Sequence, residues 1–142
     1  MTKILLIDDE EMIRKCVRSI LKSENYVLEE ASEAEPVLDM LNANPVDIVI
    51  SDLFLPGKDG LKLIEEVRRD FPAIKIIAIT GGGLHLFDPK NALNAARRSG
   101  ADYTLMKPIK RKDLLSALKT VMDQAPISSK NDEEEKPSKE VF

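Results

Sequence analysis

Five short apolar segments, each followed by a segment of helical spacing, constrain the fold more than any other feature of this sequence. The apolar segments are predicted strands at residues 3–7, 26–28, 46–51, 75–79 and 103–106. Most are rich in aliphatic side chains, which is typical of strands buried on both faces of a parallel sheet. Strands that alternate with helices over short links favour an α/β fold with helices on both sides of the sheet. Five units are too few for a (β/α)8 barrel, so we expect an open, doubly wound sheet.

Apolar residues recur at helical spacing after each predicted strand. We expect helices at residues 10–23, about 36–44, 61–70, 89–99 and around 114–124. Ser32 and Glu35 have the spacing of a capping box ahead of the second helix. Asp88 is the expected N-cap of the fourth helix, and Gly100 is expected to end it.

Length and charge limit the possible functions. The 142 residues suit one domain, and the 25 acidic and 21 basic side chains give a net charge of −4. This balance argues against nucleic acid as the main ligand, because phosphate binding needs a concentrated basic surface. No apolar run approaches the roughly 20 residues of a membrane span, and the N-terminus does not resemble a signal peptide. We therefore expect a cytoplasmic protein with one domain at residues 1–124 and a disordered, acidic tail at residues 125–142.

Polar side chains follow four of the five predicted strands. These side chains are Asp8, Asp9, Asp52, Thr80 and Lys107. Asp52 alone could merely cap a loop. However, the carboxyl ends of parallel strands meet at one edge of the sheet, where open α/β sheets bind ligands. With strand order 2-1-3-4-5, the first and third strands are neighbours, and their three carboxylates converge.

Three converging carboxylates repel one another unless a cation lies between them. Mg²⁺ commonly binds one or two carboxylates together with water and a phosphate oxygen. Thr80 can donate a hydrogen bond to a phosphoryl oxygen, and Lys107 can neutralise its charge. A carboxylate that attacks phosphorus forms an acyl phosphate, a known type of covalent intermediate. The set therefore predicts a site for Mg²⁺ and a phosphoryl group.

This combination of residues resembles the receiver domain of bacterial two-component response regulators, in particular stand-alone receivers of the chemotaxis type. The resemblance rests on Asp8-Asp9, on Asp52 with Leu-Pro-Gly-Lys-Asp-Gly at residues 55–60, on Thr80-Gly81, on Gly100-Ala101-Asp102 and on Lys107-Pro108. It covers about residues 3–124 and implies a flavodoxin-like (βα)5 fold with strand order 2-1-3-4-5.

The resemblance also implies a function. A sensor histidine kinase or a histidine phosphotransferase would transfer a phosphoryl group to Asp52 in a Mg²⁺-dependent reaction. The domain would promote only its own phosphorylation and dephosphorylation, and would signal to a downstream protein by switching conformation. It would be a signalling protein rather than an enzyme.

By the same likeness, Asp9 and Asp52 bind Mg²⁺ directly, Asp8 acts largely through water, and Phe54 contributes its backbone carbonyl. Lys107 corresponds to the family's lysine.

The switch region departs from the family in two ways. Thr80 corresponds to the family's switch hydroxyl, but Thr104 occupies the position where the family usually carries Tyr or Phe. Tyr103 is one residue early and is expected on the opposite face of its strand. The segment between Thr80 and Lys107 is also longer than usual, with the extra length at residues 81–88.

Two other functions fit parts of the pattern. A phosphohydrolase with an aspartyl nucleophile usually carries a second acid two residues further on, where this chain has Phe54. A degenerate receiver would bind partners without being phosphorylated, but the presence of all five pocket residues argues against it.

Overall fold

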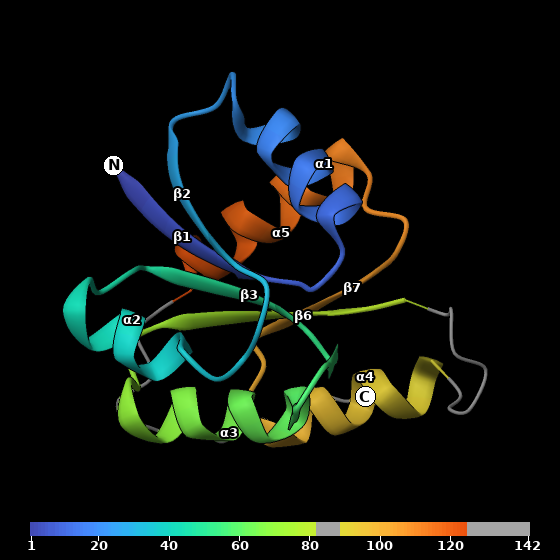
Figure 1. Ribbon diagram of the computed structural model, residues 1–142. Coiled ribbons are helices and arrows are strands. Elements are labelled where there is room, and N and C mark those ends of the chain that lie inside the picture. Colours follow the sequence, from blue (N-terminus) through green and yellow to red (C-terminus); the bar gives the residue numbers. More distant parts are fainter. Residues whose placement is uncertain (82–88, 125–142) are drawn as a thin grey trace.

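The computed structural model describes residues 1–81 and 89–124, and its centre is a parallel sheet of five strands. The strands lie in the order β2 (Tyr26–Ala31), β1 (Thr2–Ile7), β3 (Ile48–Asp52), β6 (Lys75–Thr80) and β7 (Tyr103–Met106) (Figure 1). This order confirms the predicted 2-1-3-4-5 topology, because β4 and β5 form a separate short hairpin outside the sheet. Because the five strands of the sheet are parallel, their carboxyl ends lie at the same edge of the sheet.

Helices cover both faces of the sheet (Figure 1). One face carries α1 (Glu11–Leu21) and α5 (Arg111–Asp123), and the other carries α2 (Val37–Ala43), α3 (Gly60–Asp70) and α4 (Pro89–Ser99). Alternate residues of β1 enter different cores: Leu5 and Ile7 pack with α2 and α3, whereas Ile4 and Leu6 pack with α1 and α5. All four side chains are fully buried, as predicted for a strand covered on both sides. None of the helices in the described ranges combines the length and apolar character that a membrane span requires.

The second strand is longer than predicted. The sequence indicated residues 26–28, but β2 continues to Ala31. It lies at the edge of the sheet, where polar side chains can remain partly exposed. There, Arg18 donates hydrogen bonds of 2.7 and 2.8 Å to the Glu30 carboxylate. The polar residues that seemed to end the strand therefore belong to it.

The predicted capping box before the second helix is wrong. Helix α2 begins at Val37 behind Pro36, and no side chain caps its first turn. The Val37 N–H instead donates to the Ala34 carbonyl at 3.1 Å, so a backbone turn takes the place of the expected cap. The third strand also starts later than predicted, at Ile48 rather than Val46. The predicted N-cap Asp88 and the extra length at 82–88 lie outside the described residues.

Helix α4 ends before Gly100, as predicted, and the next residues fix the start of β7. Gly100 has a φ of +125°, a conformation that favours glycine. Arg68 donates to the Gly100 carbonyl at 2.9 and 3.2 Å and to the Asp102 carboxylate at 2.6 Å. Asp102 also accepts the Ile76 N–H at 2.8 Å. Because these bonds tie the start of β7 to β6, they set the position of the residues that follow β7.

Candidate functional site

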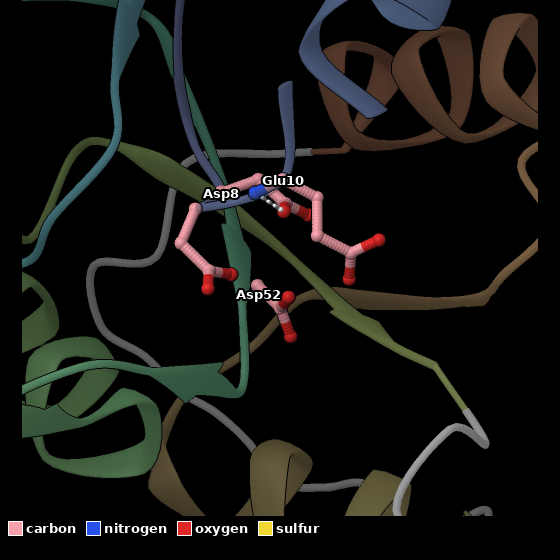
Figure 2. A group of neighbouring side chains, drawn as sticks. Asp8, Glu10 and Asp52 are labelled. Carbon is pink, nitrogen blue, oxygen red and sulfur yellow. Dashed lines mark hydrogen bonds between the residues drawn. The ribbon is translucent and has the colours of Figure 1, made fainter. Parts of the chain in front are cut away.

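Four carboxylates meet where β1 and β3 end. Oxygen atoms of Asp8, Asp9, Glu10 and Asp52 all lie within 4.8 Å of one another, and Figure 2 shows three of these side chains. Asp8 and Asp52 are buried, with exposed fractions of 0% and 3%, whereas Asp9 and Glu10 are exposed. The strand order brings Asp8, Asp9 and Asp52 together as predicted. Glu10 is the member that the sequence analysis missed, although it directly follows the two aspartates.

Lys107 reaches this group from the end of β7. Its Nζ lies 2.8 Å from Asp52 Oδ2, 2.9 Å from Glu10 Oε2 and 3.0 Å from Asp8 Oδ2. The Lys107 backbone N–H donates to the Thr80 carbonyl at 2.8 Å, which fixes the start of the side chain. Burial opposes the charge of the ammonium, but its hydrogen bonds to Asp52 and Glu10 raise the pKa of Lys107 well above its ordinary value. Lys107 is therefore a positive charge against the Asp52 carboxylate.

Asp8 has a strongly perturbed carboxylate. Burial raises its pKa from 3.8 to about 6, and the Asp52 charge adds to this shift, while the Glu10 N–H and Lys107 oppose it. Asp8 Oδ1 accepts the Glu10 N–H at 2.8 Å, as drawn in Figure 2. Asp8 Oδ2 is buried and accepts no hydrogen bond from the described residues, although Lys107 Nζ lies 3.0 Å from it in an ion pair.

The buried Asp8 Oδ2, which accepts no hydrogen bond from the described residues, fits a hard cation. Mg²⁺ prefers oxygen ligands, and every ligand atom that this group offers is a carboxylate oxygen. The single ammonium of Lys107 faces these carboxylates, so a divalent cation would reduce the repulsion that raises the Asp8 pKa. The residues present therefore suit Mg²⁺.

Backbone contacts hold the Asp52 carboxylate in place. Asp52 Oδ1 accepts the Phe54 N–H at 3.0 Å, while Oδ2 faces Lys107. The loop closes tightly, because the Gly60 N–H donates to the Leu53 carbonyl at 3.2 Å. A Cβ atom at residue 60 would lie 2.6 Å from backbone atoms of Asp52 and Leu53, so only glycine fits there.

The loop after Asp52 contains a hairpin that the sequence did not predict. It pairs β4 (Phe54–Leu55) with the antiparallel β5 (Lys58–Asp59). Asp59 is the N-cap of α3 and accepts the Leu61 N–H at 2.9 Å. The hairpin thus connects the acidic group to a capped helix, with half-buried Phe54 at its start.

The predicted switch residues lie on β6 and β7. Thr80 ends β6, where its exposed fraction is 2%. Thr104 pairs with Ala78 of β6. Tyr103 lies on the other face of β7 from Thr104 and packs against the core beneath α1 and α5. The structure thus places Tyr103 on the face that was predicted. A switching role for Thr80 and Thr104, and a ligand role for the Phe54 carbonyl, stay predictions.

Comparisons with known proteins identify a family for this chain. The family model described as response regulator receiver domain matches residues 4–119. An NtrX-like response regulator of Rickettsia bellii is 32% identical over 130 residues, which are 90% of this chain and 26% of that protein. The transcriptional regulatory protein ResD of Bacillus subtilis is 32% identical over 129 residues, or 90% of this chain and 51% of ResD. The chain thus spans between a quarter and half of these relatives.

A solved structure shares the fold. The CheY-like response regulator receiver domain protein of Methanospirillum hungatei is 28% identical, with a TM-score of 0.77. The match covers 87% of this chain and 94% of that one.

Proposed function

The chain belongs to the response regulator receiver domain family, and we propose that it accepts a phosphoryl group on Asp52 in a Mg²⁺-dependent reaction. One observation carries this proposal. The buried Asp52 carboxylate has Lys107 Nζ at 2.8 Å and lies in a group of oxygen ligands that includes the buried Asp8 Oδ2. This arrangement combines a nucleophile, a cation site and a fixed positive charge.

In the proposed step, an Asp52 oxygen forms a bond to the phosphorus of the donor. The bond between phosphorus and the donor's leaving group breaks, and the leaving group keeps the electron pair. The Phe54 N–H orients the carboxylate, and Lys107 stabilises the charge on the transferring group. Bound Mg²⁺, held by Asp8, Asp9 and Asp52, would supply further charge stabilisation.

The proposed donor is a sensor histidine kinase or a histidine phosphotransferase. Family membership supports this, since receiver domains act in two-component signalling. The phosphorylated chain would then change conformation through Thr80 and Thr104 and act on a downstream protein target.

Mass spectrometry with a small phosphodonor tests the proposal. Incubation with acetyl phosphate and Mg²⁺ should add one phosphoryl group, and Asp52→Asn or removal of Mg²⁺ with a chelator should prevent this addition. Asp59→Asn is the matched control: it removes an acid from the same loop, and asparagine caps helices as well as aspartate does. An Asp52→Asn protein that still gains the phosphoryl mass would contradict the assignment.

A further inference from the structure

Glu10 lies over the phosphorylation site with a fixed backbone and an exposed side chain. It is the N-cap residue of α1, and its carbonyl accepts the N–H groups of Ile13 and Arg14 at 3.1 and 3.2 Å. Its own N–H donates to Asp8 Oδ1. The side chain is 57% exposed, yet its Oε2 lies 2.9 Å from Lys107 Nζ. Figure 2 shows this carboxylate beside Asp8 and Asp52.

An incoming phosphoryl group must compete with Glu10 for Lys107. Nζ donates hydrogen bonds to Asp52 and Glu10 and has Asp8 Oδ2 at 3.0 Å in an ion pair, so a phosphoryl oxygen that reaches Nζ takes a place that one of these carboxylates now holds. Asp8 and Asp52 are buried, and among the described residues Lys107 is the one cation paired with their carboxylates, so losing it would be costly. Glu10 can turn into water at little cost, because its side chain is already more than half exposed. Glu10 is therefore the carboxylate that yields.

We propose that Glu10 is a specificity-determining residue that disfavours phosphodonors of high negative charge. This inference rests on the proposed function of Asp52. Glu10 holds Lys107 while the site is empty, and its charge at the mouth of the site repels an anionic donor as it enters. The repulsion grows with the charge on the donor. Glu10 thus affects the entry of the donor. It does not change the chemical step at Asp52.

Two small donors separate the entry of the donor from the chemistry at Asp52, because they carry different charges but give the same phosphorylated product. Acetyl phosphate enters as a dianion, and transfer breaks its phosphorus–oxygen bond to release acetate. Phosphoramidate enters as a monoanion, and transfer breaks its phosphorus–nitrogen bond to release ammonia, which keeps the proton already on nitrogen. In both reactions, an Asp52 oxygen forms the new bond to phosphorus. The donors therefore differ in the charge that Glu10 meets.

The experiment measures the rate constant of phosphorylation by each donor, from the added mass, at saturating Mg²⁺. Glu10→Gln should raise the acetyl phosphate rate constant, and should raise its ratio to the phosphoramidate rate constant by about threefold or more. High salt should shrink the change in this ratio, since salt screens exposed charges. Glu10→Asp keeps the charge and should keep the ratio close to that of wild type.

Glu33→Gln is the matched control. It removes the same charge from the loop after β2, which ends at the same edge of the sheet, but Glu33 is not in the carboxylate group. Its donor ratio should equal that of wild type. A second readout needs neither Mg²⁺ nor a donor: in the metal-free protein, the NMR signal of the Lys107 ammonium should shift in Glu10→Gln and remain unchanged in Glu33→Gln.

The outcomes distinguish this inference from the proposed function. An unchanged donor ratio in Glu10→Gln, or an equal change in Glu33→Gln, would overturn the role of Glu10 while leaving Asp52 as the acceptor. A wild-type protein that neither donor phosphorylates would overturn both. Unchanged amide spectra would show that the variants are folded, so a changed ratio could not come from unfolding.

Discussion

Replacing Gly81 with alanine should slow phosphorylation by displacing Lys107. A Cβ atom at residue 81 would lie 2.8 Å from Lys107 Cδ, whereas ordinary contact begins at 3.4 Å. The lysine stem must therefore move by about 0.6 Å, a distance that follows from these two contacts. Because Nζ lies beyond Cδ, its 2.8 Å contact with Asp52 should lengthen by a similar amount. The contact would then fall outside the range of a strong charge-assisted hydrogen bond.

The size of the effect follows from the strength of that contact. A hydrogen bond to a charged group contributes about 1.5–3 kcal/mol, and losing part of it should cost about 1 kcal/mol. Phosphorylation should therefore slow by roughly fivefold. The free energy of unfolding should change by less than about 1 kcal/mol, since the displaced atoms belong to a flexible side chain. Acetyl phosphate kinetics and urea unfolding measure the two quantities.

Gly57→Ala is the control, and it should lower the stability without slowing phosphorylation of the folded protein. No described residue has an atom within 4 Å of a Cβ atom at residue 57, but the φ of +80° disfavours alanine. This variant should lose stability while the folded fraction keeps its contact between Lys107 and Asp52. A Gly81→Ala protein that is phosphorylated at the wild-type rate would refute the steric reasoning. A fall in its stability that matches the fall in rate would show that folding, rather than Lys107, limits the reaction.

Three further predictions follow from the loop and the buried acids. Gly60→Ala should lower the free energy of unfolding in urea by about 2–4 kcal/mol, because its Cβ would meet backbone atoms at 2.6 Å; a loss below about 1 kcal/mol would contradict this. The pKa of Asp8 is raised to about 6 in the folded chain, so the folded state binds this proton more tightly than the unfolded state does. The protonated carboxyl therefore contributes to the free energy of unfolding below about pH 4, and this contribution is lost as the pH rises through 6. Asp8→Asn should thus gain roughly 1–3 kcal/mol over wild type between pH 4 and 7 without metal, and Mg²⁺ should raise its Tm less than that of wild type; equal pH profiles would oppose this. Phe54→Asn should speed phosphate loss from phosphorylated Asp52, followed by mass, because an amide can orient the attacking water and a phenyl ring cannot; an unchanged half-life would argue against that role.

The sequence predicted the fold well where periodicity decides the structure. Aliphatic runs such as 3–7 become strands buried on both faces, because helices cover both faces of a parallel sheet. It failed where tertiary contacts decide the boundary. Glu30 looked too polar for a strand, but Arg18 pairs with it at the sheet edge. Ser32 had the spacing of a cap, but the backbone turn at Ala34 replaced it.

In the candidate site too, the sequence predicted what the strand pattern decides and missed what tertiary contacts decide. Asp8 and Asp52 could be predicted to meet because parallel strands end at one edge. Glu10 could not, since its place depends on Lys107, which reaches across from a strand 97 residues further along the chain. The need for glycine at residue 60 also escaped prediction, because it comes from a close approach to backbone atoms rather than from a turn conformation.

The way in which parallel strands assemble this site would make the proposed phosphorylation depend on a folded sheet. Asp8, Asp52, Thr80 and Lys107 belong to four different strands or strand ends, far apart in the chain, and only the intact sheet brings them to one edge. An unfolded chain has the same aspartate but neither the lysine nor the cation site beside it. An unfolded copy would therefore not be phosphorylated, and the phosphorylated amount would fall in proportion to the unfolded fraction.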